Sequence, residues 1–171
     1  MPNIQNVLEG QVQEPVVFCC LNTLIRAVGL EYLLQGHHPL TLFAPVDRAF
    51  EAFGSGGVYD FLKDLDKLTV LLKYHLVPLV LTTDDLRGLA QSENGTVELP
   101  TYTNHPLKVK LAEDFTVNGY RVPRADVMAE NGVIHMLDDV LWPAGLTYKD
   151  FGTRSPASTA VGYEIDGATF R

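Results

Sequence analysis

Hydrophobic residues recur every three to four positions in two segments of the first half of the chain, which is the spacing of an amphipathic helix. In residues 16–28 the apolar positions are Val17, Leu21, Leu24 and Val28. In residues 65–76 the positions on one stripe are Leu65, Leu68, Leu72 and His75. Val77-Pro78 ends the second segment, because the residue before a proline is disfavoured in helical conformation. The pattern predicts two amphipathic helices, the second of which turns a histidine toward the core.

Shorter elements are predicted between and after these helices. Residues 40–45 form the apolar run LTLFAP, which is typical of a buried strand. The strand leads into a helix, RAFEAF, for which Asp47 is the expected N-terminal cap. The glycine-rich residues 54–57 end that helix, and residues 58–62 predict another short one. Further along, TTDDLRGL predicts a single-turn helix capped by Thr83.

From residue 94 onward the pattern changes to short apolar or alternating segments. Asn-Gly pairs lie at residues 94–95, 118–119 and 131–132, and Asn-Gly supplies the positive φ angles of tight hairpin turns. The predicted strands are TVELP, LKVKLA, FTV, YRVP, ADVMA and VIHMLDDVLW. Helices followed by antiparallel strands predict an α+β domain. After residue 143 no period persists, so residues 144–171 are expected to form an extended or partly docked tail.

Composition limits the classes of function. The chain has 171 residues, of which 46% are hydrophobic, which suits one globular domain with a substantial core. The net charge is −8 and the basic residues are scattered in the sequence, which disfavours nucleic acid as a partner. No apolar run is long enough for a transmembrane segment. The first 15 residues lack the basic start and apolar core of a signal peptide, so a cytoplasmic location is one expectation and a trimmed exported form is another.

Neighbouring polar pairs are the first candidates for chemistry: His37-His38, Asp84-Asp85, Asp138-Asp139 and Cys19-Cys20. The histidine pair lies before a proline without a nearby carboxylate or thiol, which favours a solvated turn over a metal site. The first aspartate pair favours helix capping, and adjacent strand positions would place the second pair on opposite faces. The two cysteines have no further cysteine to pair with, and Ser55 is not in a nucleophile elbow. We therefore predict no metal site, no cofactor and no catalytic residue.

His135 interrupts an apolar strand in the segment NGVIHMLDDVLWP, residues 131–143. Val133 and Leu137 share the face of His135, and the opposite face is apolar as well, so the strand is expected to be central. A buried imidazole is costly unless both ring nitrogens find partners. This favours structural roles for His135 and for His75. Catalysis and metal binding remain the alternatives.

Three segments in fixed order resemble the signatures of fasciclin-type domains, also called FAS1 or beta-Ig-H3 domains. The segments are LTLFAPVDRAF (40–50), LLKYHLVP (71–78) and NGVIHMLDDVLWP (131–143). The resemblance extends over about residues 4–143. It implies a single FAS1-like α+β domain over residues 1–143, in which a wedge of two small antiparallel sheets is flanked by a cluster of short helices. Residues 144–171 would then be a C-terminal extension. In this family both signature histidines are generally parts of the core network.

The resemblance also implies a function. Fasciclin-type domains mostly serve as extracellular or periplasmic adhesion modules that bind a protein or glycan on another surface. In animal members, integrin recognition is linked to an acidic-aliphatic-methionine segment and to the Tyr-His region. The matching residues here are Asp126, Val127, Met128, Tyr74 and His75. The Glu-Pro that usually precedes the acidic residue is replaced by Arg124-Ala125. The expected function is a non-enzymatic protein-interaction or cell-adhesion module.

Two alternatives remain open at this point. Some fasciclin-type proteins of algae carry carotenoids, so a lipophilic small molecule could bind in an apolar groove that residues 144–171 close. The second alternative is an isomerase or cyclase acting on an apolar substrate, with His37, His38, Asp47 or His105 transferring protons. No poised set of acid and base is visible in the sequence, which disfavours the enzyme.

Overall fold

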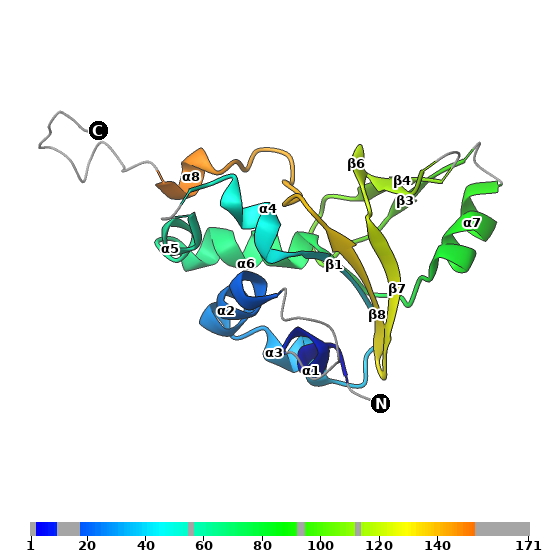
Figure 1. Ribbon diagram of the computed structural model, residues 1–171, viewed down its shortest axis with the longest axis horizontal. Coiled ribbons are helices and arrows are strands. Elements are labelled where there is room, and N and C mark those ends of the chain that lie inside the picture. Colours follow the sequence, from blue (N-terminus) through cyan, green and yellow to red (C-terminus); the bar gives the residue numbers. More distant parts are fainter. Residues whose placement is uncertain (1–2, 10–17, 55–56, 92–94, 112–113, 153–171) are drawn as a thin grey trace, which may run out of the picture.

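The computed structural model describes residues 3–9, 18–54, 57–91, 95–111 and 114–152 (Figure 1). The helices in these residues are α1 (Ile4–Leu8), α2 (Cys19–Val28), α3 (Glu31–Gln35), α4 (Asp47–Glu51), α5 (Gly57–Phe61), α6 (Leu65–Tyr74), α7 (Thr83–Gln91) and α8 (Lys149–Gly152). The strands are β1 (Leu40–Pro45), β2 (Leu76–Val77), β3 (Thr96–Leu99), β4 (Leu107–Lys110), β5 (Thr116–Val117), β6 (Tyr120–Arg121), β7 (Arg124–Ala129) and β8 (Gly132–Leu137).

The first sheet has the strand order β2-β1-β8-β7. Strands β1 and β8 are central, and every residue of both is buried, as their largely apolar sequences predict. The two strands run parallel, in register from Leu40 opposite Gly132 to Pro45 opposite Leu137. The outer strands β2 and β7 pair antiparallel to them. The first sheet is therefore mixed, which differs from the purely antiparallel sheets expected from the sequence.

The second sheet is antiparallel, with the order β3-β4-β5-β6. Side chains alternate between buried and exposed along β3 and β4, so one face of this sheet is inside and the other faces solvent. The inner face packs with Phe43 of β1 and Leu137 of β8 in a second hydrophobic cluster. The α+β class with two small sheets and several short helices is confirmed.

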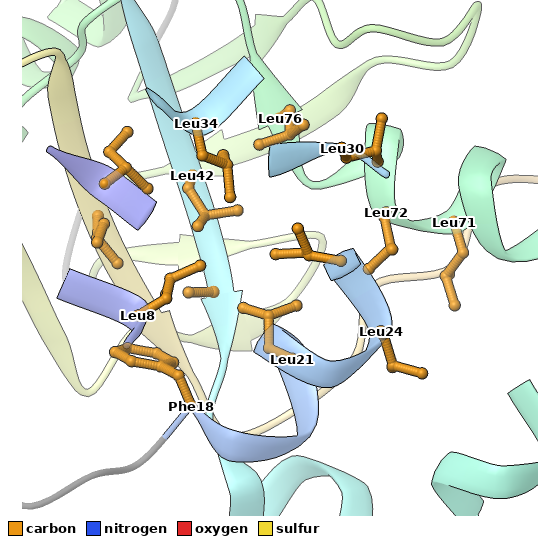
Figure 2. Close-up of a cluster of buried hydrophobic side chains, with 14 of the residues drawn as sticks. Leu8, Phe18, Leu21, Leu24, Leu30, Leu34, Leu42, Leu71, Leu72 and Leu76 are labelled. Carbon is orange, nitrogen blue, oxygen red and sulfur yellow. The ribbon is translucent and has the colours of Figure 1, made fainter. Parts of the chain in front are cut away.

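The opposite face of the first sheet is covered by helices. Leu42 and Ala44 of β1 and Ile134 of β8 belong to the first and larger hydrophobic cluster. Figure 2 shows leucines from α1, α2, α3 and α6 converging on β1 in this cluster. The central strands thus separate two cores, one beneath the helices and one beneath the second sheet (Figure 1).

The predicted long helices are present with small differences. Helix α2 begins at Cys19 and ends before Gly29, which has φ 73°, while Val17 lies outside the described residues. Helix α6 spans Leu65–Tyr74 and buries Leu68 and Leu72. Leu65 is 46% exposed, so its assignment to the buried stripe is wrong. It is the first residue of α6.

Neither Asp47 nor Thr83 forms the helix cap that the sequence predicts, so both predictions are wrong. Asp47 is the first residue of α4 after Val46, and its Oδ1 accepts the backbone N–H of Cys20 at 2.8 Å. It therefore satisfies a free donor in the first turn of α2 instead of capping its own helix. At α7 the Oγ1 of Thr82, not Thr83, accepts the N–H of Asp85 at 3.3 Å. The Asp85 carboxylate in turn accepts the N–H of Thr82 at 3.0 Å, so these two residues form a reciprocal cap.

The Asn-Gly pairs serve different purposes. Asn118 and Gly119 have φ angles of 51° and 88°, as a tight hairpin turn requires. Gly132 has no positive φ; it lies in β8, where a Cβ atom would be 1.8 Å from the carbonyl oxygen of Leu40. The glycine is needed there because two strands approach closely, which sequence alone did not indicate. In the first pair, Gly95 has φ 83° and Asn94 lies outside the described residues.

The beginning of the C-terminal extension packs against the helices. The Tyr148 ring stacks on Phe53 with centroids 4.5 Å apart, and its hydroxyl donates a hydrogen bond to the Asp60 carboxylate. Burial, together with Asp60, raises the pKa of Tyr148 to about 12. Phe151 of α8 is 3% exposed and lies 5.0 Å from Phe61, between ring centroids. Residues 144–152 therefore complete the first core, and residues 153–171 lie outside the described part.

Candidate functional site

His135 lies at the centre of the first sheet and is fully buried. Its Nδ1 accepts the backbone N–H of Asp126 at 3.2 Å, so Nε2 carries the proton and donates to the carbonyl of Leu81 at 2.8 Å. Burial lowers the pKa of His135, although the Leu81 carbonyl and the charge of Asp126 oppose this shift. The ring is a neutral bridge between β8, β7 and the segment that leads to α7.

His75 forms a similar bridge with the opposite tautomer. It follows the last residue of α6 and is 1% exposed. Its Nδ1 is 2.8 Å from the carbonyl oxygen of Leu71 and donates to it, while Nε2 accepts the N–H of Leu141 at 3.0 Å. Burial lowers the pKa of His75 to about 4. Because both nitrogens of each ring are bonded to backbone, neither histidine is available to a substrate or a metal ion in this structure.

Tyr74 is buried as well. Its hydroxyl donates to the carbonyl of Pro106 at 3.0 Å and accepts from the Nδ2 of Asn118 at 2.9 Å. Asn118 also accepts the backbone N–H of Lys108 at 2.9 Å through Oδ1. The Tyr-His segment thus ties the end of α6 to the second sheet and to the chain after β8.

Asp126 is exposed, but its carboxylate is engaged. It has φ 60° at an irregularity of β7, between Arg124 and Val127. Its Oδ1 accepts the N–H of Thr83 at 2.9 Å, and its Oδ2 accepts the Thr83 hydroxyl. Asp126 therefore holds the first turn of α7 against the edge of the first sheet. The sequence of the segment 126–128 does not indicate this role.

The two residues after Asp126 point to opposite sides of β7. Val127 is partly buried against the first hydrophobic cluster. Met128 pairs with Val133 and is 47% exposed. Because β7 is the last strand in the order of its sheet, Met128 is an apolar side chain presented to solvent at a sheet edge. The five residues that the resemblance singled out are thus divided: Asp126 and Met128 reach the surface, Val127 is intermediate, and Tyr74 and His75 do not reach it.

The remaining candidate residues lie in separate parts of the described structure. His37 and His38 are exposed in a bend, and Asp138 and Asp139 follow the end of β8 instead of lying on it. Cys19 is exposed and Cys20 is partly buried, where burial raises its pKa to about 11. Ser55 lies outside the described residues. Nowhere in the described ranges do three His, Cys, Asp or Glu side chains gather closely enough to hold a metal ion.

A small apolar cavity lies beside His75 in the first core. It is lined by leucines of α2, α3 and α6 together with Ile25, Leu42 and Leu76, and its volume is about 10 Å³. One water molecule needs about this much space, and a pigment needs far more. Within the described residues this cavity is therefore not a preformed site for a carotenoid-like ligand.

A comparison with protein-family models gives a match over residues 18–143, to the family described as Fasciclin domain. This region contains both histidine bridges, the β7–β8 hairpin and both sheets. The chain belongs to the fasciclin family.

Relatives of this fasciclin domain include bacterial and animal proteins. It is 31% identical to the uncharacterized protein sll1735 of Synechocystis, over 82% of the chain and 98% of that protein. It is 34% identical to human stabilin-1, over 74% of the chain and 5% of stabilin-1. It is 32% identical to transforming growth factor-beta-induced protein ig-h3 of Sus scrofa, over 93% of the chain and 22% of that protein. The domain therefore spans nearly all of one relative and a small part of the two animal proteins.

A solved structure has the same fold. The FAS1 domain pair from the insect cell adhesion molecule fasciclin I superimposes with a TM-score of 0.66 at 24% identity, over 88% of this fasciclin domain and 52% of that chain. No helix in the described residues combines the length and the apolar character needed to cross a bilayer.

Proposed function

We propose that this chain is a non-enzymatic adhesion module that binds a protein on another surface through the exposed edge of β7. The observation that carries the proposal is the exposure of Met128 beside Asp126 on an edge strand. A polarisable apolar side chain next to a fixed carboxylate is a suitable centre for a protein contact. Membership of the fasciclin family and the role of insect fasciclin I as a cell adhesion molecule support this direction.

We also propose that this chain does not catalyse a reaction. Three groups with proton-transfer chemistry, His75, His135 and Tyr74, are buried and use their polar atoms in internal hydrogen bonds. A general base must reach the proton that it removes, and these three do not face a substrate-sized space in the described structure. An adhesion role further implies an extracellular or periplasmic location, which an epitope tag and fractionation of the source cells would test.

The experiment compares two apolar surface residues of equal exposure. Met128→Glu is made on β7 and Leu65→Glu on α6, where Leu65 is 46% exposed. Each protein is coated on a surface, and attachment of integrin-bearing cells is counted at matched coating density. We expect Met128→Glu to lower attachment at least fivefold and Leu65→Glu to leave it unchanged. Equal attachment to the native protein and to Met128→Glu would exclude the β7 edge as the contact.

A further inference from the structure

The outer face of the second sheet carries positive charge on an acidic protein. The exposed or partly exposed side chains of this face are Thr96, Glu98, Lys108, Lys110, Thr116 and Arg121. Three of them are cationic and one is anionic, whereas the whole chain has a net charge of −8. The face lies on the far side of the second sheet from the core and from the helices α1–α6 (Figure 1).

The strand register arranges these side chains in a defined row. Thr96 of β3 is directly opposite Lys110 of β4, which is opposite Thr116 of β5, which is opposite Arg121 of β6. Directly opposed residues point to the same face, so hydroxyl, cation, hydroxyl and cation follow one another across four strands. With strands about 4.8 Å apart, the two cations of the row are roughly 10 Å from each other.

A second row adds one more cation. Lys108 lies two residues before Lys110 on the same face of β4, about 7 Å away along the strand. Its direct partner is Glu98 of β3. Among the described residues, no ion pair within 4 Å involves Lys108, Lys110 or Arg121. Within the described ranges, none of the three cations therefore has a carboxylate at ion-pair distance.

From this arrangement we infer that the outer face of the second sheet binds an acidic polysaccharide in which uronic acid units alternate with neutral sugars. The carboxylates would pair with Lys110 and Arg121, and the hydroxyls of Thr96 and Thr116 would bond the neutral units between them. Charged and neutral sugars alternate along the polymer, as cations and hydroxyls alternate along the row. The surface differs from the β7 edge, so this inference does not depend on the proposed protein contact.

Other anionic partners fit the face less well. A protein interface relies on aromatic or large aliphatic anchors, and the residues of this face that the structure describes include none. Single-stranded nucleic acid needs aromatic stacking platforms, which this face also lacks among those residues. A duplex presents closely spaced phosphates, and a net charge of −8 repels such a dense polyanion more than a polymer with one charge on every second unit.

The test uses the full chain and a defined oligosaccharide. The probe is an unsulfated chondroitin octasaccharide, in which glucuronate alternates with a neutral amino sugar, and binding is followed by calorimetry and by NMR shifts. A triple variant, called the sheet variant, removes the cations of the face by combining Lys108→Gln, Lys110→Gln and Arg121→Gln. The control Arg48→Gln, Lys63→Gln, Lys67→Gln removes the same charge from α4 and from the region of α5 and α6. Matched melting temperatures show that both variants are folded.

We expect the sheet variant to bind at least tenfold more weakly and the control to bind like the native protein. Thr96→Val with Thr116→Val should weaken binding a few fold without altering its salt dependence, because hydroxyls carry no charge. Met128→Glu should bind the octasaccharide normally. Equal losses in the sheet variant and its control would overturn the inference, as would tighter binding of a poly-glutamate peptide or duplex DNA of equal charge.

Discussion

Gly132 shows how one residue can be fixed by a close backbone approach. It opens β8 opposite Leu40, and the parallel pairing of β1 and β8 begins at this contact. The neighbouring Asn131 reinforces it, since its Nδ2 donates to the carbonyl of Leu34 at 2.8 Å and its Oδ1 accepts the N–H of Ile4 at 3.0 Å. The hairpin thus anchors α1 and α3 as well as turning the chain.

Replacing Gly132 by alanine should therefore be severe. The new Cβ would lie 1.8 Å from the Leu40 carbonyl oxygen, so β1 and β8 must separate. We expect a loss of about 3 kcal/mol or more in the free energy of unfolding, as for other overpacked buried sites. The matched control is Gly88→Ala in α7, where nothing lies within 4 Å and helix propensity favours alanine by about 0.5–1 kcal/mol. Urea unfolding followed by Trp142 fluorescence measures both, and a native-like midpoint for Gly132→Ala would contradict the contact.

At the same scale, sequence pattern predicts which residues are apolar and inside, but not what a polar side chain bonds. The stripe of Leu68, Leu72 and His75 is buried because local spacing determines a helix face. Asp47 and Asp126 look like ordinary acidic residues beside a helix and on a strand. Each accepts an N–H from the first turn of a distant helix, at Cys20 and Thr83 respectively. Long-range partners of this kind leave no local signal.

At the scale of elements, helix α7 depends on a residue outside it. Its first residue, Thr83, is held through backbone and hydroxyl by the carboxylate of Asp126 on β7. The chain before it is held by His135, which donates to the carbonyl of Leu81. A substitution of Asp126 would therefore change the position of α7 as well as any direct contact, so Met128 is the cleaner test of direct contact.

Asp126→Gly isolates the carboxylate, because glycine adopts the φ of 60° without strain. We expect the free energy of unfolding to fall by about 1–2 kcal/mol, as for the loss of a helix cap, and the amides of α7 to exchange faster with deuterium. Asp84→Ala is the control, since the Asp84 side chain is 93% exposed and makes one weak pair with Arg87. Unchanged protection of α7 in Asp126→Gly would show that the helix holds its place without this bond.

The pairing of elements marks the limit of sequence reasoning for the fold. Hairpin pairs such as β5–β6 and β7–β8 follow from turn residues between neighbouring strands. The parallel pair β1–β8 joins residues about 90 positions apart, and local alternation carries no information on it. The family signatures place both strands in the domain. The residues that the resemblance links to integrin recognition include both exposed Met128 and buried Tyr74, because a motif records residue identity and not burial.

At the scale of the whole molecule, two neutral histidines join the cores. His75 connects α6 to the chain after β8, and His135 connects β8 and β7 to the segment before α7. Protonation of either ring would convert its accepting nitrogen into a donor and break a bond to a backbone N–H. In the folded protein each ring is therefore neutral and does not take up a second proton.

Because the folded rings stay neutral, the free energy of unfolding falls as the pH is lowered. The ordinary pKa of histidine is 6.5, and burial lowers that of His75 to about 4. Between these values the unfolded chain binds a proton that the folded chain does not, so the free energy of unfolding falls as the pH is lowered through this window. A displacement of this size corresponds to about 3 kcal/mol for His75. His135, whose pKa is also lowered, adds to the loss in the same direction.

Urea unfolding between about pH 7 and pH 5 measures this effect where most carboxylates are still ionised. We expect the native protein to lose stability steadily over this range, with a net uptake of protons on unfolding. His75→Asn should be less stable at pH 7 but should have a shallower pH dependence, because one of the two excluded protons is gone. A native slope in His75→Asn, or equal stability of the native protein at both ends of the range, would show that the folded state accommodates imidazolium. The two rings would then not be the neutral bridges on which the joining of the two cores depends.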